Sequence, residues 1–352
     1  MKPLLTIAIL ILIVNALYGQ ASKWDPAKAG TWRLENHLPD KSYKTRNITL
    51  SATDNIAFKQ NISTLAEWFR QNNRMLKTPT GYDLRALVTW VWSDYSTIMD
   101  YDYAIPCEMG FLFELFYSDG SKWKVEPPQY NFDINATYGG IDGLFFTPES
   151  IVDDGSRYDQ SLSGKVDKAL NNLRQYFRVY PLKESPHPGV DIYQAYRDGW
   201  QQNGRQRIVV YNPERPPYWI PVTVSEMADA HLAYYSLFQK KEIDRMLLEQ
   251  LKQEIAELTP EELAAPAYAG HDSHFVLQVN GTRKGYQIMR FNPAYWDRSL
   301  PPSAIQFMAF FNENLTVDEM ADQEKRSYPN FPQLFVNEIK WDKIATLIMK
   351  KK

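Results

Sequence analysis

The sequence predicts an α+β protein with two mostly antiparallel sheets that contain β-hairpins and are each covered by helices. Two observations lead to this fold class. Asp119-Gly120 and Asn280-Gly281 each separate two β-type runs, and such dipeptides supply the positive backbone angles that a tight hairpin requires. Strands and helices do not alternate regularly along the chain, which excludes a doubly wound fold and an eight-stranded barrel.

The predicted elements form two units. The N-terminal unit covers 22–127 and the C-terminal unit covers 166–352. Residues 128–165 are rich in Gly, Pro and aromatic side chains. This composition indicates either a functional loop or the link between the two units.

A helix opens the regular part of the N-terminal unit. From Ser51 to Met75 apolar residues recur at helical spacing, with Thr53 or Asp54 available as a cap. Pro79-Thr80-Gly81 ends this region. Residues 82–92 then alternate, which predicts a strand with its bulky side chains inward. Two more strands follow at 108–117 and 122–126, joined by a turn at 118–121.

The C-terminal unit begins with a helix at 166–177, a turn-rich segment at 180–189 and a strand at 207–211. Thr223 and Glu226 have the spacing of a capping box, which opens one long helix or two helices as far as Leu258. The remaining predicted elements are a short helix at 259–264, a second sheet with strands at 275–279, 287–291 and 303–311, and helices at 316–325 and 335–349.

One short pattern occurs twice. Tyr211-Asn212-Pro213 and Phe291-Asn292-Pro293 each end a predicted strand and are followed by further aromatic residues. Two copies do not make a repeat family, because repeat arrays show several copies at a fixed period. We interpret them as similar strand exits that require rigid turn chemistry.

The N-terminus has the pattern of a secretory signal. Lys2 is followed by an apolar run from Leu4 to Val14, which is shorter than the roughly 20 residues of a membrane-spanning helix. Gly19 and Ala21 suit a peptidase site, so we expect a signal peptide at 1–21. The mature chain is therefore predicted to be secreted or periplasmic, soluble and without stable membrane insertion.

Composition limits the partners. The formal net charge of −3 and the scattered cations predict no nucleic-acid binding. The single cysteine, Cys107, excludes an intrachain disulfide and is expected to be a buried, inert thiol; a nearby His would make it a nucleophile. Aromatic residues make up 14% of the chain, and we expect most of them to pack in the core.

The densest group of metal-ligand side chains is His271-Asp272-Ser273-His274. In a strand, His271 and His274 point to opposite faces, whereas one metal ion needs converging ligands. We therefore predict no metal site, with these two histidines as the alternative. Residues 153–159 resemble a calcium loop only loosely, and no nucleotide-binding loop or serine-nucleophile motif occurs, so we predict no cofactor.

Carboxylate pairs such as Glu108 and Glu114 suit a glycosidase only if their spacing in space is right. The chain also contains N-x-[ST] sequons, which we interpret as chance occurrences because the signal does not identify a host. They begin at Asn47, Asn61, Asn135, Asn280 and Asn314.

The predicted recognition surface combines the loop at 138–146 with the segment at 216–219. Its candidate ligand-binding residues are Tyr138, Asp142, Tyr218 and Trp219, and the three aromatic rings could stack on a glycan or a peptide. The alternative is that Pro216-Pro217-Tyr218-Trp219 forms a rigid corner over the core.

These observations favour an exported, soluble, non-enzymatic binding or envelope-associated protein. The alternative function is an extracytoplasmic hydrolase, which would require His271, His274, His231 or Cys107 to meet a carboxylate in a cleft.

Overall fold

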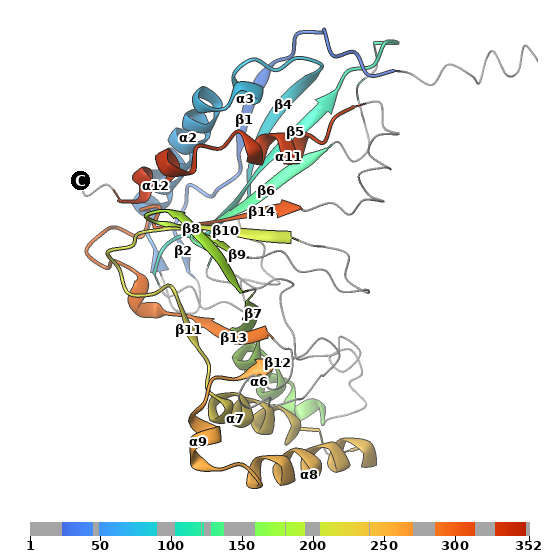
Figure 1. The fold of residues 1–352 in the computed structure, drawn as a ribbon, viewed down its shortest axis with the longest axis vertical. Helices are drawn as coiled ribbons and strands as arrows, with labels where there is room; N and C mark the ends of the chain where they lie inside the picture. Colours follow the sequence, from blue (N-terminus) through green and yellow to red (C-terminus); the bar gives the residue numbers. More distant parts are fainter. Residues whose placement is uncertain are drawn as a thin grey trace, which may run out of the picture.

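The computed structural model describes residues 23–44, 49–89, 103–120, 122, 128–136, 159–179, 181–193, 205–238, 240–269, 286–313 and 328–349. Two sheets follow each other along the longest axis of the molecule, with helices packed on each (Figure 1). This arrangement confirms the α+β prediction. In the part of the chain that the structure describes, no helix combines the length and apolar character that a membrane span needs.

The larger sheet has eight strands. Only β1 and β4 run parallel, and the other neighbouring strands are antiparallel. Its order is β1 (Trp32–Asn36), β4 (Tyr82–Thr89), β5 (Cys107–Leu115), β6 (Gln129–Ile134), β14 (Phe307–Glu313), β10 (Arg205–Tyr211), β9 (Val190–Tyr193) and β8 (Leu182–His187). A separate short hairpin pairs β2 (Tyr43–Lys44) with β3 (Thr49–Leu50).

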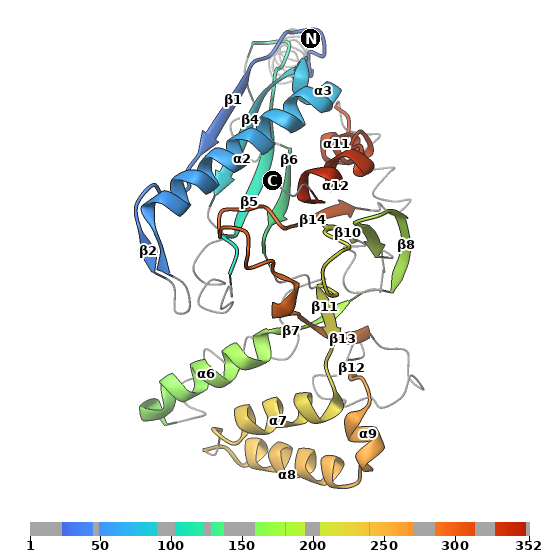
Figure 2. The same ribbon diagram turned by 90° about the vertical axis from the view of Figure 1, so that its left-hand side faces the viewer.

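Helices cover one face of the large sheet, which we call the helix face (Figure 2). The alternation in β4 explains this, because every second residue is buried and the residues between are half-buried. The covering helices are α2 (Ala52–Asn72), α3 (Arg74–Lys77), α11 (Phe331–Asn337) and α12 (Trp341–Met349). The single helix predicted at 335–349 is therefore two helices.

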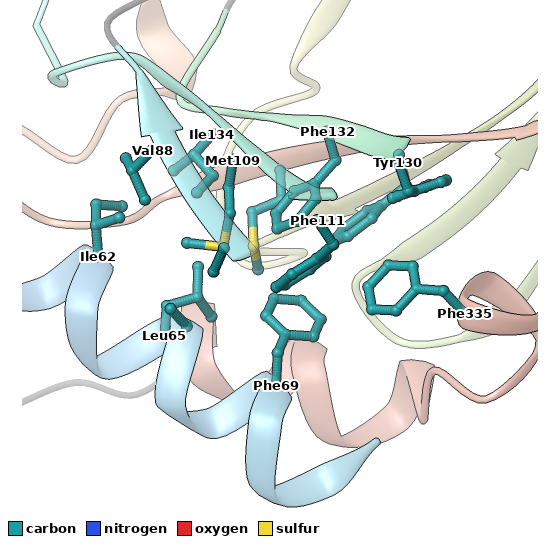
Figure 3. Close-up of a cluster of buried hydrophobic side chains, with 14 of the residues drawn as sticks. Ile62, Leu65, Phe69, Val88, Met109, Phe111, Tyr130, Phe132, Ile134 and Phe335 are labelled. Carbon is teal, nitrogen blue, oxygen red and sulfur yellow. The ribbon is translucent and has the colours of Figure 1, made fainter. Parts of the chain in front are cut away.

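Aromatic rings fill the space between α2, α11 and the sheet. Phe69 and Phe335 both pack against Phe111 of β5, with ring centroids 5.9 and 4.9 Å away (Figure 3). Phe69 is 1% exposed, and full burial of such a side chain contributes about 1.5–3 kcal/mol. The N-cap of α2 is Ser51, which forms a capping box with Asp54 at the third helical position, so the predicted cap at Thr53 or Asp54 is wrong.

The smaller sheet is antiparallel and is centred on β13 (Tyr286–Phe291). β7 (Tyr176–Val179) pairs with one edge of β13, and β11 (Trp219–Pro221) and β12 (Tyr268–Ala269) pair along the other. Its outer face packs on helices through Tyr176 and Ile288. These helices are α6 (Ser163–Arg174, preceded by the 3-10 turn η1, Gln160–Leu162), α7 (Val224–Tyr235), α8 (Glu242–Ala256) and α9 (Pro260–Ala264).

The predicted long helical pattern is resolved as two helices, α7 and α8. The expected capping box at α7 forms only half of its contacts: the Thr223 hydroxyl accepts from the Glu226 N–H, at 3.1 Å. The Glu226 carboxylate instead pairs with Arg290 of β13, with 3.0 Å between Oε1 and Nε. Arg290 of the sheet has therefore replaced the backbone N–H of Thr223 as the partner of the Glu226 carboxylate. The box at α9, between Thr259 and Glu262, is complete.

The structure corrects the predicted strand pairing. The segment expected to lie in the second sheet at 303–311 is β14, which pairs with β10 and β6 in the large sheet. Strands β6, β7 and β8 occupy segments where the sequence predicted connections, turns or the end of a helix. The large sheet thus takes strands from both predicted units.

The repeated Asn-Pro pattern marks two crossovers between the sheets. β10 leaves the large sheet at Asn212 and enters β11, and β13 leaves the small sheet at Asn292 and returns to β14. Each Asn side chain accepts a backbone N–H two residues later, from Glu214 at 3.0 Å and from Ala294 at 3.1 Å. The interpretation as similar strand exits is confirmed. We call segments 212–218 and 292–297 together the neck.

Candidate functional site

Tyr218 and Trp219 lie at the junction of the two sheets. Here the face of the small sheet that does not carry helices packs on the second face of the large sheet, the one opposite the helix face. Each is 5% exposed. The Trp219 ring contacts Phe177 of β7 and Tyr193 of β9, with centroids 5.4 and 5.0 Å away. Neither ring presents an open face for stacking, and both belong to an aromatic cluster that joins the two sheets.

The hydroxyl of Tyr218 takes part in a buried network around Asp191. Tyr218 donates to Oδ2 of Asp191 at 2.7 Å, and Tyr211 and Ser185 donate to Oδ1 at 3.3 and 2.5 Å. Because the single hydroxyl proton of Tyr218 is used by Asp191, the hydrogen bond between the two phenols requires Tyr193 to donate to Tyr218. Burial is the main cause that raises the pKa of the Tyr193 and Tyr218 hydroxyls, which therefore stay protonated.

The network continues along the second face of the large sheet. Tyr193 is the register partner of Arg207 on β10. The Arg207 guanidinium reaches across β14 to Asp133 of β6, with 3.8 Å between Nη1 and Oδ2. Ala309 of β14 is the register partner of Asp133, and its small side chain leaves room for this reach. Asp133 in turn lies opposite Glu108 of β5.

Five of these side chains lie in a row across the strands of the large sheet, and Tyr218 of the neck joins the row through Asp191 and Tyr193; we call all six the polar row. Its floor is buried, since Arg207 is 4% and Asp133 8% exposed, whereas Glu108 and Tyr193 at its rim are half-buried. The members of the polar row are Asp191, Tyr218, Tyr193, Arg207, Asp133 and Glu108.

Both of the opposing carboxyl groups have raised pKa values. Burial is the largest effect on Asp133; together with the nearby Glu108 charge it outweighs Arg207 and raises the Asp133 pKa to about 7. Burial also raises the pKa of Glu108. Strongly perturbed acids next to a specific charge are candidates for functional groups.

Glu108 and Glu114 differ in their surroundings although both lie on the second face of β5. Glu114 accepts from the guanidinium of Arg33 at 3.1 and 3.3 Å. Glu108 makes no ion pair or hydrogen bond with the residues that the structure describes. The carboxylate that Glu108 meets is Asp133, not Glu114, so the sequence pair is not the spatial pair.

The other predicted site residues either lie apart from the polar row or fall outside the residues that the structure describes. Cys107 is fully buried in the core under the helix face, where burial raises the thiol pKa. His231 is buried in α7 of the other unit, where burial lowers its pKa to about 4. The structure does not bring these two together. Tyr138, Asp142, His271, His274 and the loop at 153–159 lie outside the described residues.

Sequence reasoning missed Asp133, Arg207, Asp191 and Tyr193. Asp191 and Asp133 are each the single charge within a short β-type run, VDIY and QYNFDI, and Arg207 is one of two arginines at the start of β10. A charged residue within such a run could have indicated a buried polar site, because buried charges are rare unless they are paired. Among the described residues, no group of three or more His, Cys, Asp or Glu side chains is arranged to hold a metal ion.

Comparison with known proteins adds no relative. No protein-family model, no curated protein and no solved structure matches this chain.

Proposed function

We propose that this protein is exported and acts as a binding protein without enzymatic activity, and that its ligand, a glycan or a peptide, contacts the rim of the polar row. The observation that carries the proposal is the continuity of this row from buried Asp191 to half-buried Glu108. Ligand sites are commonly found where two packed units meet and a few polar groups converge.

The chemistry of the rim suits such ligands. Glu108 offers a carboxylate without a partner among the described residues, and Tyr193 offers a half-buried ring. Carboxylates accept hydrogen bonds from sugar hydroxyls or peptide amides, and rings pack on flat apolar surfaces. Asp191 and Tyr218 hold the Tyr193 hydroxyl in place from below.

Binding should be tested on the chain from residue 22 onward against glycan and peptide collections, followed by calorimetry on each hit. Glu108→Gln and Tyr193→Leu, which removes the ring, should each weaken binding about tenfold, which corresponds to about 1.4 kcal/mol. Glu114→Gln is the matched control, since it lies on the same face of β5 but in a separate ion pair. Equal affinity in all three variants would reject the polar row as the site.

Export needs its own experiment. Cell fractionation with N-terminal sequencing should recover a chain that begins near residue 20–22 outside the cytoplasm. Recovery of intact Met1 from the cytoplasm would reject export without affecting the test of the polar row.

The pair Glu108 and Asp133 also favours a second candidate, an extracytoplasmic hydrolase. Two opposing carboxyls with raised pKa values can divide the roles of general acid and base. Turnover of a bound glycan or peptide that is lost in both Glu108→Gln and Asp133→Asn would support this candidate over simple binding.

A further inference from the structure

An apolar surface on α8 continues into a pocket beside α7. Leu248 and Leu251 of α8 are buried in the core between the small sheet and its helices. Ile243 and Met246 are 55% and 61% exposed. α7 and α8 lie side by side at the end of the molecule farthest from the large sheet (Figure 2).

The pocket is reached along one face of α8. Residues 243, 247, 250 and 254 are spaced by four, three and four positions, so they share a face of the helix. The pocket is lined by Tyr235, Leu247, Gln250, Leu251 and Glu254. This face of α8 is therefore apolar toward the start of the helix, at Ile243 and Leu247, and polar toward its end, at Gln250 and Glu254.

This surface differs from the other exposed apolar side chains. Ile56, Leu182 and Leu334 are also exposed, but each lies on a different element. Single exposed apolar residues are ordinary, whereas contiguous ones mark interaction sites. Ile243 and Met246 are one helical turn apart and adjoin the pocket.

The charge around the pocket is acidic. Residues 240–264 contain seven acidic and four basic side chains. Three of the four cations, Lys240, Lys241 and Arg245, lie at or just before the start of α8, and the fourth, Lys252, is paired with Glu249 at 2.7 Å. Glu254 in the pocket wall accepts only from the side chain of Gln250 among the described residues, at 2.9 Å, and forms no ion pair with them.

We propose that this surface of α8, with the pocket beside it, is the docking site for a cationic amphipathic segment of a partner protein. Apolar side chains of the partner would cover Ile243 and Met246 and enter the pocket, and its Lys or Arg side chains would meet Glu254. The acidic charge selects this occupant, because a basic helix with one apolar face complements both features. This site is separate from the polar row and does not depend on it.

The test uses the mature chain and two synthetic 14-residue helical peptides. Both carry Leu on one face, and the other face is Lys in the first peptide and Glu in the second. The Lys peptide should bind with micromolar affinity that weakens with added salt, and the Glu peptide should bind at least tenfold more weakly. Equal binding of the two peptides would overturn the proposal.

Variants locate the binding surface. Ile243→Ser and Met246→Ser should each lower the affinity for the Lys peptide at least fivefold, and Glu254→Gln about threefold. Ile56→Ser is the matched control, because Ile56 is 56% exposed on α2 of the other unit. All four positions are exposed, so thermal unfolding should change little. An equal effect of Ile56→Ser, or a self-association that Ile243→Ser abolishes, would overturn the proposed partner.

Discussion

Arg215 holds Tyr295 by its backbone across the neck. The Nε of Arg215 donates to the Tyr295 carbonyl at 2.9 Å, and its Nη2 donates to the carbonyls of Ala294 and Trp296 at 3.2 and 2.7 Å. The hydroxyl of Tyr295 is itself hydrogen-bonded to Asn212, directly after β10, and to Gln306, directly before β14. These contacts join the two crossovers into one body.

Tyr295→Phe should therefore lower the free energy of unfolding by about 2–3 kcal/mol. The hydroxyl accepts from the Asn212 N–H at 2.9 Å and donates to the Gln306 carbonyl at 2.5 Å, and the substitution leaves both groups without this partner. Denaturant unfolding measures the change. Tyr268→Phe is the control, because no hydroxyl contact of Tyr268 is present in the described chain, and a similar loss there would contradict the explanation.

The pH dependence of stability should reveal Asp133. In the folded protein Asp133 keeps its proton up to about pH 7, whereas the unfolded chain releases it near 3.8. Between these values the folded state binds one more proton, so the free energy of unfolding falls as pH rises, by up to about 1.4 kcal/mol per pH unit. Asp133→Asn removes this fall, so the variant should gain stability relative to the parent as pH rises from 4 to 7. A constant difference between the two would contradict the raised pKa.

His231 should act in the opposite direction. Its pKa is lowered from 6.5 to about 4 by burial, so the unfolded state binds more protons between these values. The free energy of unfolding therefore rises with pH over this range, and His231→Gln should remove the rise. Urea titrations at pH 4.5, 5.5 and 6.5 compare parent and variant. The effect of His231→Gln on stability should be most favourable at pH 4.5.

Asn135 should be intolerant of a carboxylate. Its backbone has a positive φ of 52°, and its Nδ2 donates to the carbonyls of Ile105 and Ala304 at 3.0 and 2.9 Å. Asn135→Asp places a negative charge against those two carbonyls, and we expect a loss of about 3–5 kcal/mol at pH 8. Asn61→Asp is the control; it loses one bond, to the Ser303 carbonyl, at a half-buried site, and should cost less.

Cys107 should be unreactive in the folded protein. Its side chain is fully buried, and burial raises its pKa, so little thiolate is available. A thiol reagent such as iodoacetamide should label it only after unfolding in urea. Rapid labelling under native conditions would show that the core around β5 opens.

Local signals in the sequence predicted several elements correctly. The apolar spacing of α2, the alternation of β4 and the Asn-Pro exits at 212 and 292 all appear in the structure. Each depends on contacts between residues a few positions apart, which sequence spacing expresses directly.

The same local signals did not predict the candidate site. Asp133 of β6 lies opposite Glu108 of the neighbouring strand β5, and Arg207 of β10 reaches Asp133 across β14, so their approach depends on the order of the strands in the sheet. Their spacing along the chain carries no trace of this order. The short strand β6 was missed as well, because its segment lies in a turn-rich composition.

The amino-acid order alone determined the fold class, the existence of α2 and α9 and the two strand exits, since backbone preferences and neighbouring hydrogen bonds act within a few residues. Strand pairing determined three further features. β14 pairs in the large sheet, the Glu226 carboxylate pairs with Arg290 instead of completing the capping box of α7, and Asp133 lies opposite Glu108. Those outcomes depend on which apolar faces can be buried together, and that is settled only when the whole chain packs.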